Sequence, residues 1–279
     1  MKKLMPAALL ALTAVVAHAG PSKNLESSAV VDGTIVLAKD GAVQLATVEH
    51  PEKYGQPIAD LVHKVALTWR FDPVLRDGQP VIAKASMHVR VILTKNADGN
   101  FTARIKGATF GGNNADTPDD LYSENQKKIG PRYPMAAIKA RVQGTVYLAL
   151  HVDHEGHVID AVAEQVNLEN TGPDGVLQKY RELMAKSSLD AARRWTYRVP
   201  TTGQLAGQGS WTLHVPIAYT LNETGAAPVE RVWRTYVPGP YTPAPWVDKP
   251  SMTTADALAD DGSYTEGAGP VLRSSLDHG

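Results

Sequence analysis

A pattern that occurs twice along the chain constrains its fold most strongly. Both copies begin with Gly-Thr and an apolar run, then have a glycine turn and a second apolar run that ends in glutamate; they read GTIVLAKDGAVQLATVE from Gly33 and GTVYLALHVDHEGHVIDAVAE from Gly144. A helical stretch follows in each copy and ends in a Trp-x-aromatic motif, at Trp69 and Trp195. We therefore predict that the chain contains a diverged internal repeat.

The spacing of apolar residues assigns the order β-β-α-β to each copy. In the second copy, Val146, Leu148 and Leu150 alternate with more polar positions, a period of two that is typical of a strand with one buried face. The stretches before the two tryptophans have apolar residues at helical spacing instead. We predict an α+β fold of two-layer units, in which a three-stranded antiparallel sheet packs on helices.

Composition shifts place the boundaries between these units. A degenerate first repeat is expected at 30–95, a linker rich in Gly, Asn and Asp at 96–129, and the complete second unit at 130–222. The remaining residues, 223–279, are rich in proline and glycine, and we expect a largely irregular tail there.

The first residues of the chain have the pattern of a secretory signal. Lys2 and Lys3 precede an apolar run of about 13 residues that ends in Ala17-His18-Ala19. We predict a signal peptide at 1–19, with a short membrane anchor as the alternative, and a periplasmic location. The chain has no cysteine, and its formal net charge is −1. These values exclude thiol chemistry and disfavour nucleic acid as a partner.

The histidine-rich stretch HVDHEGH is the one candidate for a metal site. His151, Asp153 and His157 would lie together on the outer face of a hairpin whose turn contains Gly156. H-E-x-x-H zinc sites need a helix, which this alternation excludes. We therefore expect solvated polar residues and no resident metal or cofactor, and keep a metal-dependent enzyme centred on His151 and His157 as an alternative. We find no nucleophile constellation and expect a protein that is not an enzyme.

Residues 131 to 221 resemble the C-terminal domain of the TonB family. The resemblance rests on an ordered set of motifs: Pro-x-Tyr-Pro, Gly-x-Val, Val-Asp-x-x-Gly-x-Val, Leu-Asp-x-Ala, Trp-x-aromatic and Val-Pro-Ile. Here these are Pro131, Tyr133 and Pro134; Gly144 and Val146; Val152, Asp153, Gly156 and Val158; Leu189, Asp190 and Ala192; Trp195 and Tyr197; and Val215, Pro216 and Ile217. The long proline-rich stalk that precedes this domain in the family has no counterpart before residue 131.

The resemblance implies a binding protein of energy-coupled transport. Its partner would be an extended segment of an outer-membrane TonB-dependent receptor and, if the chain is anchored, also the inner-membrane motor proteins. The partner-binding residues would be Tyr133, Pro134, Trp211, Leu213, Val215, Pro216, Ile217 and Tyr219. Tyr133-Pro134 could equally fix the entry into the short helix that follows.

Pro216 points to an edge strand independently of the family. A proline has no N–H to donate to a sheet ladder, so within a sheet it belongs at an edge. An edge strand presents unpaired backbone groups to which an extended peptide can add. Alternatively, Pro216 simply blunts the edge, or the tail or the first copy covers it. In the first copy Arg90 holds the matching position and would guard an edge. The alternative is a periplasmic scaffold in which the final strands of the two copies pair with each other and leave no edge for a receptor.

Overall fold

The computed structural model describes residues 25–96, 98–111, 119–125, 129–221, 231–248, 255–258 and 262–276. The predicted signal or anchor at 1–19 lies outside the described residues. In the described ranges, no helix has both the length and the apolar character that a membrane crossing requires.

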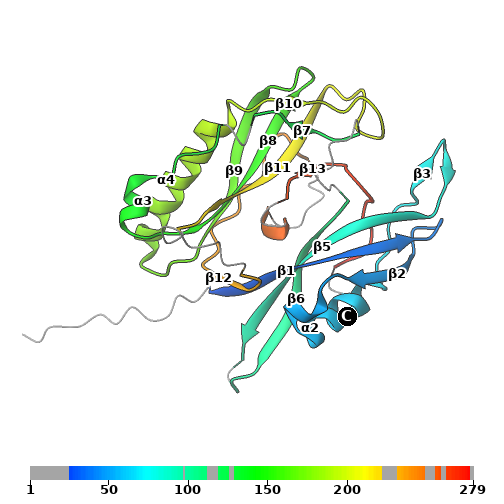
Figure 1. Ribbon diagram of the computed structural model, residues 1–279, viewed down its shortest axis with the longest axis horizontal. Helices are drawn as coiled ribbons and strands as arrows, with labels where there is room; N and C mark the ends of the chain where they lie inside the picture. Colours follow the sequence, from blue (N-terminus) through cyan, green and yellow to red (C-terminus); the bar gives the residue numbers. More distant parts are fainter. Residues whose placement is uncertain are drawn as a thin grey trace, which may run out of the picture.

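The first half of the chain forms a twisted antiparallel sheet with two short helices against it (Figure 1). Its elements are β1 (Glu26–Leu37), β2 (Val43–Val48), α1 (Pro51–Tyr54), α2 (Gln56–Ala66), β3 (Leu75–Arg76), β4 (Gln79–Pro80), β5 (Ala83–Lys95) and β6 (Phe101–Phe110). The strand order is β2-β1-β5-β6, and β3 and β4 form a separate hairpin.

The predicted linker at 96–129 is therefore wrong over much of its length. Residues 101–110 form β6, which pairs with β5 from Met87 to Lys95. Ile105 and Phe110 of β6 are buried in the same core as β1 and α2. A second short strand in the range, β7 (Tyr122–Ser123), pairs with β10 (Tyr197–Arg198).

The second half forms another antiparallel sheet beneath a long helix. After α3 (Met135–Lys139) come β8 (Gly144–Asp153), β9 (Val158–Leu168), α4 (Asp174–Ala192), β10 and β11 (Ser210–Tyr219). The sheet order is β9-β8-β11, with β11 paired along its entire length to β8. This order matches β2-β1-β5 in the first half. In both halves a helix lies in the connection to the last of these three strands: α2 between β2 and β5, and α4 between β9 and β11.

The predicted α+β class with antiparallel sheets is confirmed, although neither sheet stops at three strands. β6 extends the first sheet beyond the predicted unit. Two strands from the C-terminal segment, β12 (Arg234–Tyr236) and β13 (Tyr264–Thr265), add to β1 and β11. A common origin of the two halves stays a prediction.

The C-terminal segment is irregular in secondary structure, as expected, but it is part of the folded body. After β12, Val237 bridges to Leu168 at the outer edge of β9, and the Thr242 N–H donates to the Glu164 carbonyl. A single 3₁₀ turn, η1 (Ala255–Ala257), is completely buried between the two sheets (Figure 1). Leu272 then bridges to Phe71 in the first half.

This segment explains why β8 is buried on both faces. The sequence pattern predicts one buried face, yet every residue from Gly144 to Leu150 is buried. One face packs against α4 through Val146, Leu148 and Leu150. On the other face, Tyr147 packs with Leu258 and Tyr264 of the C-terminal segment. The molecule thus has layers in the order helices, sheet, C-terminal segment, sheet, helices.

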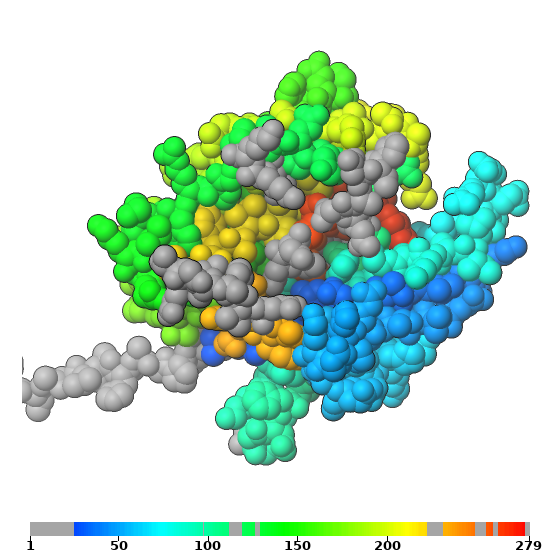
Figure 2. Space-filling view, in the orientation of Figure 1, coloured from blue at the N-terminus to red at the C-terminus, as the bar shows by residue number. Residues whose placement is uncertain are grey.

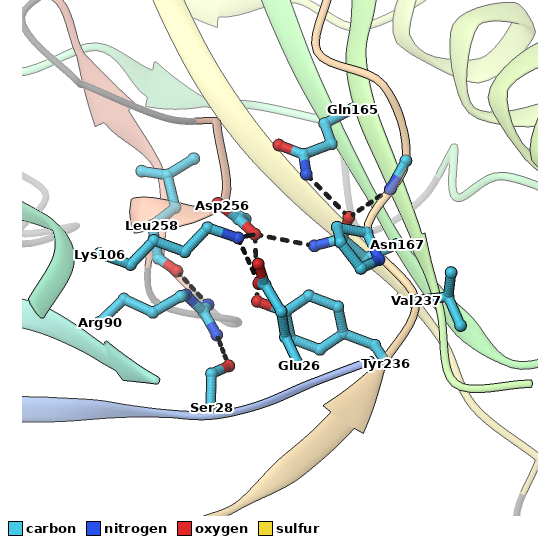
Figure 3. Close-up of polar contacts among 12 residues, drawn as sticks. Glu26, Ser28, Arg90, Lys106, Gln165, Asn167, Tyr236, Val237, Asp256 and Leu258 are labelled. Atoms are coloured by element: carbon cyan, nitrogen blue, oxygen red, sulfur yellow. Dashed lines mark hydrogen bonds and ion pairs between the residues drawn. The ribbon is translucent and has the colours of Figure 1, made fainter. Parts of the chain in front are cut away.

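A buried network of charged and polar groups joins the two sheets at η1 (Figure 3). The Lys106 ammonium of β6 donates to the carboxylates of Glu26 (2.5 Å) and Asp256 (2.7 Å). Asp256, which is fully buried, also accepts from Asn167 of β9 (3.0 Å) and from the Tyr236 hydroxyl (3.1 Å). Burial on its own raises the pKa of Asp256, but the charges of Lys106 and Arg90 and the hydrogen bonds from Lys106 and Asn167 together outweigh it and lower the pKa.

Arg90 belongs to the same junction and does not guard an edge. It lies on β5, between β1 and β6, and is 2% exposed. Its guanidinium donates to the Ser28 hydroxyl (2.9 Å) and to the Leu258 carbonyl (2.8 Å). The predicted role of Arg90 is therefore wrong, because β6 occupies the edge that the sequence assigned to β5.

Candidate functional site

The edge of β11 that faces away from β8 is the candidate binding site. β13 covers part of this edge, where Leu213 pairs with Thr265 and His214 with Tyr264. From Val215 to Tyr219, β8 is the one strand that pairs with β11 within the part of the chain that the structure describes. The space-filling view shows β11 in yellow beside the red segment that contains β13 (Figure 2).

Hydrogen bonding fixes which residues of β11 face this edge. The Thr212 carbonyl accepts from the Glu266 N–H (2.9 Å), so the backbone groups of Thr212 point outward. In an antiparallel ladder this direction alternates along a strand, and the pairing of β11 with β8 has no bulge. His214, Pro216 and Ala218 therefore also point outward. Pro216 removes one donor there, and Ala218 is left with an N–H and a carbonyl at the open part of the edge.

Most of the predicted partner-binding side chains point into the core. Trp211, Leu213, Val215, Ile217 and Tyr219 are all buried and pack in the cluster beneath α3 and α4. In the folded state they cannot contact a partner directly. What β11 offers a partner at this edge is its backbone. Beside it lie two side chains on the face opposite the core, the half-buried Pro216 and the exposed Ala218.

The Tyr133-Pro134 pair holds the entry to α3. Pro134 is the N-cap residue of this helix. The Tyr133 hydroxyl donates to the Val142 carbonyl (2.6 Å), and its ring lies edge-on to that of Tyr219 with centroids 5.1 Å apart. Of the two roles that the sequence left open, these contacts support the structural one, although the partly exposed Tyr133 still borders the end of β11.

A buried histidine between two glutamates is the main feature that the sequence did not reveal. His214 is 1% exposed, and its ring nitrogens lie 2.9 Å from Glu164 of β9 and 2.9 Å from Glu266, just after β13. Burial lowers the pKa of His214, but hydrogen bonds to the two carboxylates outweigh this and raise it to about 9. The ring is therefore an imidazolium at neutral pH and donates to both. The glutamates lie 50 residues before and 52 residues after His214, so no local motif announces them.

The histidine-rich hairpin brings two of the three candidate metal ligands together, Asp153 and His157, with Glu155 as a third neighbour in place of His151. The His151 ring stacks on Trp246 (centroids 5.3 Å apart), away from a small exposed group formed by Asp153, Glu155 and His157. Asp153 accepts from the backbone N–H groups of Glu155 (2.9 Å) and His157 (2.8 Å). The bond from His157 is the main reason that the pKa of Asp153 is lowered. This carboxylate therefore shapes the turn.

The final strands of the two halves do not pair with each other. β5 lies between β1 and β6, whereas β11 lies between β8 and β13 in the other sheet. The self-paired arrangement that the scaffold alternative requires is therefore wrong.

Two adjoining cavities, of about 500 and 440 Å³, lie beside the β3–β4 hairpin. Both are lined by Val74, Ala83, Lys84, Gln204 and Gly269. None of their lining residues comes from Val215–Tyr219. They are thus separate from the open edge of β11.

Comparison with known proteins supports the resemblance read from the motifs. The chain is 31% identical over 103 residues to Protein TonB of Xanthomonas campestris pv. campestris, in strain B100 and equally in strain ATCC 33913. The match covers 37% of this chain and 39% of each relative, so the aligned part spans about two fifths of their length. No family model matches the chain, and no solved structure does. Over this 103-residue stretch, the chain is similar to TonB proteins, as its motifs predict.

Proposed function

We propose that this chain is a periplasmic, non-catalytic, TonB-like binding protein. It supports energy-coupled transport by binding an extended segment of an outer-membrane TonB-dependent receptor at the outer edge of β11. The observation that carries the proposal is the edge from Val215 to Tyr219, which no strand among the described residues pairs with on its outer side, in the half of the chain that has the TonB-like motifs.

The chemistry of the edge fits addition of a strand. An added strand gains affinity from main-chain hydrogen bonds and specificity from the side chains that flank the edge. The outward N–H and carbonyl of Ala218 are available for such bonds, as is the carbonyl of Pro216. β11 pairs with β8 along its whole length and buries its core-facing side chains, so its outer edge is already extended in the free chain.

Two substitutions on this edge test the proposal in opposite directions. Ala218→Pro removes the outward N–H without touching the ladder to β8 and should weaken peptide binding about tenfold. Pro216→Ala restores an outward N–H and should leave binding intact or strengthen it. The measurement is titration of the full chain with peptides from the N-terminal periplasmic segments of TonB-dependent receptors, followed by calorimetry.

Circular dichroism spectra of both variants provide the control for folding. The proposal is wrong if no receptor peptide binds the unaltered chain, or if folded Ala218→Pro binds as well as the unaltered chain does.

A further inference from the structure

β13 is held at the edge of β11 by very little backbone. It is two residues long, and one further bond joins the Glu266 N–H to the Thr212 carbonyl. By comparison, β8 and β11 pair over ten residues. Strand pairing this short is marginal on its own, so side chains must supply most of the force that keeps β13 in place.

The Glu266 carboxylate is the most specific of these side-chain contacts. It is diagonal to His214 across the two strands, a spacing that long side chains can bridge. The buried imidazolium of His214 donates one hydrogen bond to Glu266 and the other to Glu164. If β13 left, His214 would lose the Glu266 carboxylate and the nearby Tyr264 ring, and it would keep only Glu164 of its two carboxylates. A buried charged donor without a partner is costly, so whatever replaces β13 must bring a carboxylate.

We propose that β13 is an internal occupant of the β11 edge, and that the partner which displaces it is an extended peptide carrying a carboxylate for His214. This inference rests on the proposed function in that it names the chemistry of the same site's partner. The inference goes beyond the proposed function in stating that the chain occludes part of its own binding edge. In the closed form a partner reaches Val215–Tyr219, and in the open form it also reaches His214 and Thr212.

The sequence around β13 supplies the probe. A fluorescently labelled peptide with the sequence of residues 262–268 (GSYTEGA) reproduces the contacts of β13 from a separate molecule. A matched peptide with glutamine in place of glutamate tests the carboxylate alone. The host is the full chain, unaltered or as Glu266→Gln, with Glu182→Gln as a control on the exposed face of α4.

The Glu266→Gln chain should bind the glutamate peptide at least about tenfold more tightly than the unaltered chain does, because a weakened occupant competes less. It should bind the glutamine peptide about tenfold more weakly than the glutamate peptide. Glu182→Gln should behave as the unaltered chain. Equal affinities of the two peptides, or of the Glu266→Gln and unaltered chains, would overturn the inference.

Hydrogen exchange without any peptide separates this inference from the proposed function. The amides of Tyr264 and Glu266 should exchange faster in Glu266→Gln than in the unaltered chain, while amides in the β8–β11 ladder stay unchanged. If the β13 amides exchange only together with the ladder, β13 does not leave independently and the inference fails. If they exchange as expected but no receptor peptide binds, the proposed function fails and the internal occupant stands.

Discussion

At the scale of single residues, two glycines show how the same contact is built in both halves. Gly41 and Gly156 have positive φ values of 82° and 84° in the first hairpin of each sheet. The carbonyl of each accepts a hydrogen bond from the backbone N–H of the second aromatic residue of the Trp-x-aromatic motif. The donor is Phe71 for Gly41 (2.9 Å) and Tyr197 for Gly156 (2.8 Å). The motif and the turn therefore belong together: the chain after the helix docks on the hairpin that precedes it.

A methyl group at Gly156 would destroy this contact. Its carbon would lie 1.8 Å from the Tyr197 carbonyl oxygen, while a methyl group at Gly99, with φ 87°, would meet nothing within 4 Å. We predict that Gly99→Ala loses about 1 kcal/mol of unfolding free energy through backbone strain alone, and Gly156→Ala on the order of 3 kcal/mol. Urea unfolding checks this, and equal losses would contradict it.

His214 makes stability depend on pH in a defined direction. Its pKa is about 9 in the folded state, above its ordinary 6.5, so its contribution is complete below pH 6.5 and is lost as the pH rises through 9. Glu164, Glu266 and the Tyr264 ring face it, and Tyr241 interacts with the same two glutamates. We predict a fall in unfolding free energy on the order of 2–3 kcal/mol between pH 6.5 and 9.5.

Urea unfolding at several pH values measures this fall, and His214→Asn should flatten it. NMR titration of the His214 ring in the unaltered chain gives an independent reading. A ring that titrates near pH 6.5 would contradict the ion-pair geometry.

At the scale of elements, the sequence predicted the strands and helices of the second half well because their patterns are local. The glycine turn, the alternation in β8 and the helical spacing before Trp195 each lie within one short window. β6 was missed because it lies between an Asp-Gly turn and a Gly- and Asn-rich stretch, so the whole range read as a loop.

β6 should nevertheless be essential to the first sheet. Ile105 is 5% exposed in the core, whereas Phe101 at the start of the strand is 61% exposed. We predict that Ile105→Ala costs about 2–4 kcal/mol of unfolding free energy, and that Phe101→Ala, although it removes more atoms, changes it by about 0.5 kcal/mol or less. Thermal and urea unfolding check which variant loses more stability. A larger loss for Phe101→Ala than for Ile105→Ala would contradict the placement of β6 in the core.

The predicted edge at Pro216 illustrates the limit of reasoning from pattern. A proline in an alternating strand marks an edge because of its missing N–H, and Pro216 does lie beyond β13 on the outer side of β11. The side chains around it were expected to meet a partner, yet they fill the core. Alternation shows that a strand has two faces, but which faces are covered depends on segments far away in the sequence.

At the scale of the whole molecule, the C-terminal segment turns two similar halves into one body. Its irregular composition hid this role, because its bonds go to β1, β6, β9 and β11 and follow no period. The burial of Asp256 between β6 and β9 is the clearest sign of it. No window of sequence could have paired Lys106 with a residue 150 positions away.

The network at η1 should therefore contribute more to the unfolding free energy than an ion pair at the surface does. We predict that Asp256→Asn lowers the unfolding free energy by about 3 kcal/mol or more, because it leaves Lys106 buried with a weaker set of partners. Asp190→Asn, which breaks an exposed pair with Lys186 at 2.7 Å, should leave the unfolding free energy nearly unchanged, because solvent screens such a pair. Urea unfolding of both variants tests this, and equal effects would mean that the junction does not hold the sheets together.

The central claim is that an extended receptor segment adds to the outer edge of β11. Its most direct test is amide hydrogen exchange of the full chain, measured by NMR, with and without a saturating receptor peptide. The account predicts that the Ala218 amide, which faces the open edge, becomes protected at least about tenfold. The amides of Val215 and Tyr219, which face β8, should change little. Protection that appears elsewhere while the Ala218 amide exchanges as in the free protein would contradict the account.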